Sequence, residues 1–256
     1  MPDLKYIAPA GLMRYWDYER RFRTLGMPPE WARKKSYRKA IDASLVEMIP
    51  ADHRANLKCV VDVGANVGEW SVGIAMLTHA SDIVAFEPVP ETFAQLRQNC
   101  TPFSQIRCIQ SALGDGVGEI EMNVHRLQPM SSILTLQDEA RHVHGMEDDI
   151  ATHVRVPITT LDQALSGTGD ISLLKIDVQG YEPHVLAGAR SVLQRTRLLM
   201  VEVTYSSYYK GDVQFADLHY LITSASRFKL WGISAPHCAL SGKPMWADAV
   251  YVKQEG

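Results

Sequence analysis

Charged side chains interrupt two apolar stretches of the sequence near their ends. Lys175 and Asp177 close the stretch Ile171-Ser-Leu-Leu-Lys-Ile-Asp177, and Glu202 lies within Leu198-Leu-Met-Val-Glu-Val203. Residues two apart on a strand point to the same face, so Lys175 and Asp177 would lie together near its carboxyl end. An unpaired charge is costly to bury, so we expect these two residues to form a pair. The pair would either orient a substrate and take part in transfer of its proton, or close the end of the sheet as a structural ion pair.

Two further arrangements of these residues would also support chemistry. Asp177 and Glu202 together offer oxygen ligands to a hard divalent cation such as Mg²⁺. Without a metal, Glu202 would assist by orienting Lys175 or the acceptor. His237 lies between the last two expected strands, where a loop can overhang an active site, and it is therefore a candidate base.

A second group of candidate residues surrounds a glycine turn. The stretch Cys59-Val-Val-Asp-Val-Gly-Ala-Asn-Val-Gly-Glu-Trp70 predicts a buried strand, a tight turn and the first turn of a helix. Gly64 allows the sharp turn, and Gly68 allows a close approach to a neighbour. We expect Asn66 to cap the helix, with Glu69 in the position of a capping-box acid. Backbone amides at this helix start would then face a carboxylate or a phosphate.

The spacing of this turn distinguishes between two classes of cofactor. A dinucleotide fingerprint has glycine where this chain has Asn66, so that a pyrophosphate can approach the backbone. The side chain argues against a pyrophosphate and favours S-adenosylmethionine, which has a carboxylate, an ammonium and a ribose diol. Asp62 would meet the ammonium directly or through water. Glu87 follows Gly64 by 23 residues, at the end of the next strand, and would accept hydrogen bonds from both ribose hydroxyls.

Strand-like and helix-like segments alternate along most of the chain from residue 57 onward. Such repeated units predict an α/β fold with a mostly parallel sheet and helices on both faces. The last two strands have no helix between them and would form an antiparallel pair at the edge. The expected strands are 57–63, 82–86, 106–110, 171–177, 198–203, 228–231 and 247–252, with helices over 67–79, from about residue 90, over about 182–193 and over 213–225.

Two segments depart from this alternation. Residues 116–160 read as an antiparallel insertion near the active edge, and 137–152 within it as an exposed mobile loop. Residues 1–56 are basic and aromatic and predict a helical extension, which would cap one edge of the domain or serve as a lid or an anionic-substrate surface. Residues 57–256 would form the main domain.

Five motifs together resemble the FkbM-type S-adenosylmethionine-dependent methyltransferases, over roughly residues 57–255. This resemblance implies a class I methyltransferase fold, a Rossmann-like doubly wound sheet with an antiparallel last strand. It also implies O-methylation of sugars or polyketide-like natural products. The motifs are Val61-Asp-Val-Gly-Ala-Asn-Val-Gly68, Ala85-Phe-Glu-Pro88, Ala112-Leu-Gly-Asp115, Leu173-Leu-Lys-Ile-Asp-Val-Gln-Gly-Tyr-Glu182 and Val201-Glu202.

The resemblance also implies site residues. Ser111 to Asp115 lie where similar enzymes contact adenine, and Ser131 and Ser132 resemble the family's extension near the acceptor. The cofactor contacts that we expect are Asp62, Gly64, Ala65, Asn66, Gly68, Glu87, Pro88, Ser111, Ala112, Asp115 and Asp177. A nicotinamide-dependent oxidoreductase on a similar sheet and a non-catalytic cofactor-binding module are the alternatives.

Bulk properties narrow the class of partner. The 256 residues carry a net charge of −3, which argues against a dedicated nucleic-acid binder. The four cysteines have no CxxC spacing and are expected to be reduced core thiols of a cytoplasmic protein. We see no signal peptide and no apolar window that approaches the roughly 18 residues of a membrane span. We therefore expect a small-molecule or oligosaccharide acceptor, with a homo-oligomer as one possible assembly.

Overall fold

The computed structural model describes residues 40, 45–124, 131–135, 137, 152–207, 209–224, 226–239 and 241–254. Most of the expected helical extension over 1–56 and of the expected loop over 137–152 lies outside these residues. Within the extension, the described part contains the short 3-10 helix η3 (Val46–Met48) and helix α3 (Ala51–Arg54).

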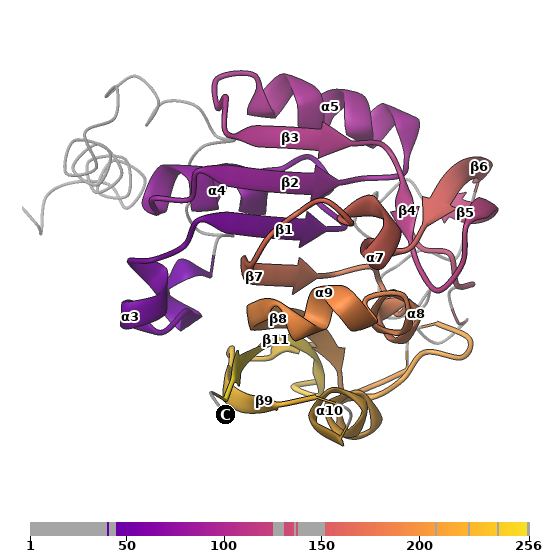
Figure 1. Ribbon diagram of the computed structural model, residues 1–256. Helices are drawn as coiled ribbons and strands as arrows, with labels where there is room; N and C mark the ends of the chain where they lie inside the picture. Colours follow the sequence, from indigo (N-terminus) through magenta and orange to yellow (C-terminus); the bar gives the residue numbers. More distant parts are fainter. Residues whose placement is uncertain are drawn as a thin grey trace, which may run out of the picture.

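The described strands form one large sheet with the order β10-β11-β8-β7-β1-β2-β3, and β9 pairs with β11 (Figure 1). The five strands from β8 to β3 are parallel, whereas β11 runs antiparallel to both β8 and β9. The predicted Rossmann-like sheet with a reversed last strand is therefore confirmed. The strands are β1 (Cys59–Val63), β2 (Asp82–Phe86), β3 (Ile106–Ile109), β7 (Ile171–Ile176), β8 (Thr196–Thr204), β9 (Phe228–Ile233), β10 (His237–Cys238) and β11 (Pro244–Lys253).

Helices cover both faces of this sheet, which makes it doubly wound (Figure 1). Because both faces are covered, strand β1 buries Val60, Val61 and Val63 in succession instead of alternating with polar residues. None of the helices in the described parts of the chain has the length and apolar character needed to cross a membrane. The helices on one face include α4 (Glu69–Leu77) and α5 (Pro90–Cys100), and those on the other include α7 (Leu161–Ala164), α8 (Glu182–Ala187), α9 (Arg190–Gln194) and α10 (Phe215–Ser224).

The helix expected after β7 is interrupted. The structure has two short helices there, α8 and α9, separated at Gly188 and Ala189. A Cβ atom at Gly188 would overlap the backbone carbonyl of Gly114. The chain thus approaches another backbone segment at a point where only glycine fits, and the break accompanies this approach.

A second, smaller sheet lies beyond the carboxyl ends of the parallel strands (Figure 1). Its strands are β4 (Ala112–Leu113), β5 (Gly118–Val124) and β6 (Thr152–Thr159), in the order β4-β6-β5. The β5–β6 pair is antiparallel, as expected for the insertion, whereas β4 pairs with β6 in parallel. Ser132 forms only an isolated antiparallel bridge with Asn123. The insertion therefore places one more layer next to the strand ends.

Candidate active site

The turn after β1 contacts the ends of both strands that flank β1 in the sheet, β2 and β7. Gly64 has a φ of 79°, and a Cβ atom there would overlap the carbonyl oxygen of Asp177 at the end of β7. The amides of Gly64 and Ala65 both donate to the carbonyl of Phe86, at 3.1 and 2.8 Å. The turn is therefore fixed by its neighbours on both sides, β2 and the residue that follows β7.

The predicted cap of the next helix is wrong. Asn66 adopts a left-handed conformation with a φ of 51°, and its Oδ1 accepts a hydrogen bond from the amide of Val67 at 2.7 Å. Helix α4 starts at Glu69 with Gly68 as its N-cap. A Cβ atom on Gly68 would lie 2.7 Å from Leu96 Cδ1, so the close approach that we expected of this glycine is to helix α5.

The sequence predicted that backbone amides of this turn would face a bound carboxylate or phosphate, and for residues 64–68 this prediction is wrong. The amides of Gly64, Ala65, Asn66, Val67 and Gly68 each donate to an acceptor within the protein. Over these five residues, the turn therefore shapes the site through its backbone path and the Asn66 side chain.

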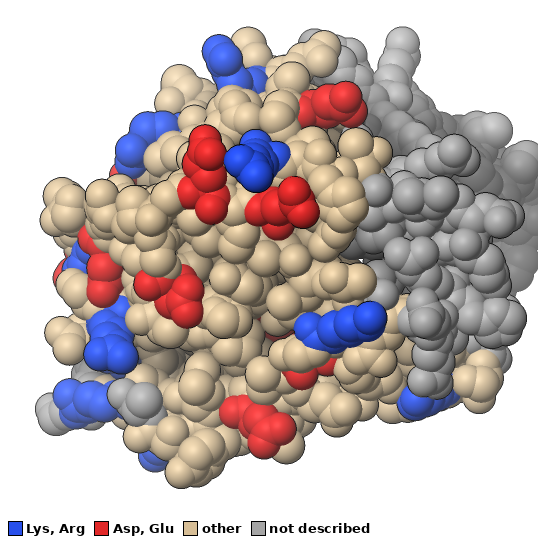
Figure 2. Space-filling model, turned by 90° about the vertical axis from the view of Figure 1, so that its right-hand side faces the viewer, with Lys and Arg blue, Asp and Glu red and all other residues tan. Residues whose placement is uncertain are grey.

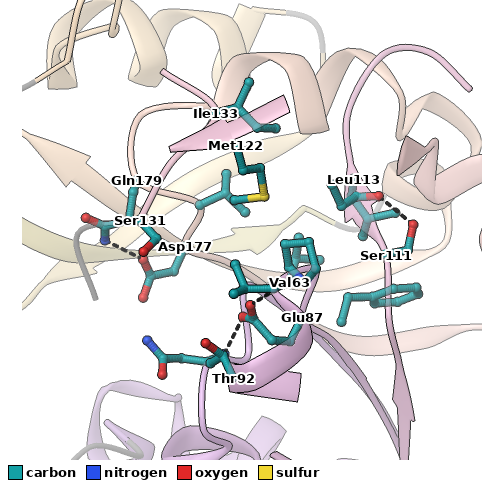
Figure 3. A pocket seen from close by; sticks show the side chains of 17 residues that line it. Val63, Glu87, Thr92, Ser111, Leu113, Met122, Ser131, Ile133, Asp177 and Gln179 are labelled. Atoms are coloured by element: carbon teal, nitrogen blue, oxygen red, sulfur yellow. Dashed lines mark hydrogen bonds between the residues drawn. The ribbon is translucent and has the colours of Figure 1, made fainter. Parts of the chain in front are cut away.

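A cleft lies above this turn at the carboxyl ends of β1, β2 and β7 (Figure 3). Its empty volume is about 780 Å³ when the open mouth is included. The view of this side of the molecule shows acidic and basic side chains interspersed around an uncharged region (Figure 2). The expected site residues that line the cleft are Gly64, Asn66, Glu87, Pro88, Ser111, Ala112 and Asp177.

Four other residues expected to contact the cofactor lie outside the lining of this cleft. Asp62 is fully buried, Ala65 packs in the core with α4 and α5, and Gly68 faces α5. Asp115 is at the surface, where its Oδ2 lies 2.9 Å from Nδ1 of His184. Any contact of these four residues with a cofactor stays a prediction.

Glu87, which directly follows β2, places its carboxyl group in the cleft lining. Its Oε2 accepts a hydrogen bond from the amide of Asn66 at 3.0 Å, and its Oε1 accepts one from the amide of Val89 at 2.9 Å. Burial raises the pKa of Glu87 to about 7, despite these two donors. Each oxygen keeps a second lone pair, so the carboxylate can still accept two hydrogen bonds from a diol.

The predicted Lys175–Asp177 pair is present and includes a third member. Lys175 Nζ lies 3.1 Å from Asp177 Oδ2 and 3.6 Å from Asp62 Oδ1. The side chain of Lys175 is only 7% exposed and Asp62 is fully buried, whereas 29% of Asp177 is exposed and lines the cleft. Lys175 therefore acts on the cleft through Asp177.

The buried charged groups shift one another's pKa values. Burial alone would lower the pKa of Lys175, but the carboxylates of Asp177 and Asp62 outweigh it and raise that pKa. Lys175 thus stays charged. Burial raises the pKa of Asp62, and the neighbouring ammonium and the hydroxyl of Ser71, which donates to Oδ2 at 2.6 Å, act against this increase.

Glu202 lies beside Asp177, but the structure does not support the predicted divalent-cation site. The side-chain amide of Gln179 donates to Asp177 Oδ1 and to Glu202 Oε2, at 3.0 Å in both cases. Burial, followed by the charge of Asp177, raises the pKa of Glu202 well above its ordinary value. In the described parts of the chain, no three His, Cys, Asp or Glu side chains are arranged to hold a metal ion.

The loop after β7 is held in an unusual conformation. Gln179 has a φ of 56° and Gly180 a φ of 95°. Glu182 Oε1 accepts hydrogen bonds from the amides of Val178 and Gly180 at 2.9 and 3.2 Å, and Ser132 Oγ donates to the carbonyl of Gln179 at 2.7 Å. A left-handed non-glycine residue persists only when its surroundings enforce it, as these contacts do.

His237 lies away from the cleft lining. It belongs to β10, is exposed, and stacks on Trp246 with ring centroids 4.7 Å apart. The structure thus gives it an aromatic partner, and its role as a base stays a prediction.

Sequence reasoning missed several residues that line the cleft. Met122 and Ile133 reach it from the insertion, and Thr92 reaches it from helix α5 (Figure 3). Ser131, which the family resemblance led us to expect near the acceptor, also lines the cleft. The role of Gln179 was also missed, although it stands two residues after Asp177. No sequence signal pointed to it, because its left-handed conformation and its contacts with Glu202 and Tyr209 are visible only in the structure.

The cleft combines the carboxylate of Glu87, held beside the glycine turn, with that of Asp177, which follows β7 on the other side of β1. Its apolar walls include Phe86, Leu113 and Met122. Glu87 offers the acceptors that a ribose diol requires, and the apolar walls suit an adenine. These residues therefore fit an adenosine-containing cofactor, with Asp177 next to the space that remains.

Comparison with known proteins gives consistent results. Residues 62–228 match the family model described as "Methyltransferase FkbM domain". The chain is 26% identical to 2-O-methyltransferase NoeI of Sinorhizobium fredii over 161 residues, which cover 60% of this chain and 66% of that protein. It is 30% identical to 31-O-demethyl-FK506 methyltransferase FkbM of Streptomyces tacrolimicus over 182 residues, which cover 62% and 67% of the two chains.

The chain spans less than two thirds of the length of the first three curated relatives it matches, between 57% and 66%. A crystal structure of methyltransferase FkbM from Methylobacillus flagellatus is similar with a TM-score of 0.49 and 16% sequence identity. That similarity covers 76% of this chain and 44% of the other.

Proposed function

Because this chain belongs to the FkbM methyltransferase domain family, we propose that it transfers a methyl group from S-adenosylmethionine to a hydroxyl oxygen of a saccharide, or of a glycosylated or polyketide natural product. The chain is a methyltransferase with the Rossmann-like fold expected of class I enzymes. The observation that carries the finer proposal is that Glu87 and Asp177 face one cleft from the ends of β2 and β7, the two strands that flank β1. The names of two relatives, 2-O-methyltransferase NoeI and 31-O-demethyl-FK506 methyltransferase FkbM, support an oxygen atom as the methyl acceptor.

Glu87 would hold the cofactor's ribose. The two backbone amides that donate to it fix the carboxylate in place before any ligand arrives, which lowers the cost of ordering it on binding. Its remaining lone pairs would accept hydrogen bonds from both ribose hydroxyls. When bound, S-adenosylmethionine supplies an electrophilic methyl group on a sulfonium centre.

Asp177 would act as the base that takes the proton from the acceptor hydroxyl. A hydroxyl is a weak nucleophile until a base begins to remove its proton, and Asp177 is the partly exposed carboxylate that lies between Lys175 and Gln179. Lys175 and Gln179 would orient this carboxylate by donating to different oxygens, and Glu202 would assist through Gln179. Alignment of the hydroxyl with the methyl group would provide much of the remaining rate acceleration.

The insertion would hold the acceptor. Met122, Ser131 and Ile133 contribute one polar and two apolar side chains to the wall near Asp177 and Gln179. This mixture suits a ligand with hydroxyl groups and apolar surface, such as a sugar or a polyketide. The sugar or polyketide class of the acceptor therefore rests on the chemistry of this wall together with the family.

Binding and turnover together test this proposal. S-adenosylhomocysteine should raise the melting temperature and bind with a Kd of about 10–50 µM or tighter, whereas NAD(H) should do neither. Methyl-labelled donor should then label at least one hydroxyl compound in a panel of mono- and oligosaccharides and polyketides. Failure of S-adenosylhomocysteine to bind would refute the cofactor assignment, and binding without labelling of any hydroxyl acceptor would refute the acceptor class.

A further inference from the structure

The side chain of Gln179 lies where a bridging cation would lie between two carboxyl groups. Its amide nitrogen donates one hydrogen bond to Asp177 Oδ1 and another to Glu202 Oε2, both at 3.0 Å. These two groups come from neighbouring parallel strands, so their side chains share the carboxyl end of the sheet. An amide has two N–H donors, and here both are used on this pair.

The rest of Gln179 is fixed in a way that keeps the amide in place. The hydroxyl of Tyr209 donates to its Oε1 at 3.1 Å, which orients the amide so that its nitrogen faces the two carboxyl groups. Its backbone carbonyl accepts from Ser132, and Glu182 accepts from the amides on either side of it. The left-handed backbone of Gln179, with a φ of 56°, is thus held by contacts that also fix the position of its side-chain amide.

From this geometry we propose that the amide of Gln179 replaces a divalent cation between Asp177 and Glu202. Gln179 then positions Asp177 together with Lys175, and methyl transfer requires no metal. The proposal rests on the proposed function for its link to turnover. Lys175 already supplies a positive charge to Asp177 at 3.1 Å, so a second cation is not needed to hold this carboxylate. A cation at the amide position would also have to displace both N–H donors.

Substitution of the amide by an isosteric carboxylate tests the inference without any acceptor. Gln179→Glu would place three carboxyl groups around one point, a set of hard oxygen ligands that suits Mg²⁺ or Mn²⁺. We expect about 10 mM MgCl₂ to raise the melting temperature of this variant by about 2 °C or more relative to EDTA, and to shift wild type by less than about 1 °C. The matched control is Gln163→Glu, which adds the same charge at an exposed position on helix α7 and should not respond.

Two results of this experiment would overturn the proposal. One is a Mg²⁺-dependent rise in the wild-type melting temperature as large as that of Gln179→Glu. The other is a Gln179→Glu protein that still binds S-adenosylhomocysteine, and is therefore folded, but does not respond to Mg²⁺ or Mn²⁺. Because no acceptor is involved, neither result depends on the acceptor assignment.

A second variant measures the positioning role. Gln179→Met keeps the approximate size of the side chain and removes its donors, and we expect kcat to fall about tenfold or more while KM for S-adenosylmethionine changes less than about threefold. EDTA should leave wild-type turnover unchanged within about twofold. Retention of kcat by Gln179→Met, or loss of wild-type turnover in EDTA with recovery on Mg²⁺ addition, would overturn the proposal. If wild type binds S-adenosylhomocysteine but labels no hydroxyl acceptor, the acceptor assignment fails, and the Mg²⁺ response still decides the role of Gln179.

Discussion

The carboxylate of Glu87 joins the ends of β1 and β2 at the cleft, because its Oε2 accepts a hydrogen bond from the backbone amide of Asn66 at 3.0 Å. Glu87 follows β2, whereas Asn66 belongs to the turn after β1. The same group therefore shapes the turn and faces the space that a cofactor would occupy.

This relationship predicts a pH-dependent affinity for S-adenosylhomocysteine. Burial raises the pKa of Glu87 to about 7, so the free protein carries a proton there at lower pH. Ribose hydroxyls donate to the ionised form, and binding must therefore release that proton below about pH 7. We expect Kd to weaken by up to about tenfold per unit as pH falls below 7, and to level above it.

Calorimetry across this pH range, with Glu87→Gln as the comparison, isolates the effect. The amide cannot ionise, so this contribution should vanish in the variant, whereas titration of the ligand's own amino group affects both proteins equally. Identical pH profiles for the two proteins would show that Glu87 does not meet the ribose. Glu87→Ala, which also removes the acceptor of the Asn66 amide, should weaken binding further.

Asp177→Asn should separate turnover from binding. The amide keeps the size of the side chain but cannot accept the acceptor's proton, so we expect kcat to fall by about 100-fold or more. The Kd for S-adenosylhomocysteine should change less than about threefold, since Lys175 and Asp62 still form their buried pair. Asp217→Asn, at an exposed position on α10, is the matched control. A variant that retains wild-type kcat would exclude Asp177 as the base.

Gly64→Ala should disrupt the site through the backbone. The added Cβ would overlap the carbonyl of Asp177, and the φ of 79° is unfavourable for any side chain. We expect a loss of at least about 3 kcal/mol in the free energy of unfolding, measured with denaturant. Gly116→Ala serves as the control, because a Cβ there meets nothing within 4 Å, and it should change stability by less than about 0.5 kcal/mol. Similar losses in both variants would contradict this account of Gly64.

Glu182 makes the stability of the protein depend on pH. Burial raises its pKa from 4.5 to about 7, so the folded state holds more protons than the unfolded state between these values. Stability therefore falls as pH rises through this window, by up to about 1.4 kcal/mol per pH unit for this one group. Glu182→Gln should remove that share of the slope, because it keeps an oxygen acceptor for Val178 and Gly180 and loses the charge.

Denaturant unfolding at about pH 5 and about pH 8 measures this change in slope. Glu182→Ala is the contrasting variant, since it leaves the two buried amides without their acceptor and should lower stability by about 1–3 kcal/mol at both values. An unchanged slope in Glu182→Gln would mean that Glu182 is not the titrating group.

The positions of the central strands and their mostly parallel arrangement could be predicted because buried parallel strands have a clear sequence pattern. The continuous apolar runs around Val61 and Leu174 are buried on both faces, as the pattern requires. The break after α8 could not be predicted, because it depends on the approach of Gly188 to the backbone at Gly114, a segment 74 residues earlier in the chain.

The site could be predicted only in part, for a similar reason. Gly64, Glu87 and Asp177 stand at strand ends, and their residue types alone indicate the cleft. Three amides of the turn, those of residues 64–66, donate to Phe86 and Glu87 at the end of β2, so the sequence could not show that these amides are unavailable. Gln179 likewise gains its role from Glu202 and Tyr209, whose positions follow only from the folded sheet.

The hydrogen bond from Ser132 to the carbonyl of Gln179, together with the bridge from Ser132 to Asn123, couples the insertion to the loop after β7. In a chimera that received residues 118–159 from another enzyme, the acceptor wall and one tether of this loop would be exchanged at once. A graft without a hydroxyl at position 132 would bring new selectivity and loosen the alignment of Asp177 in the same step.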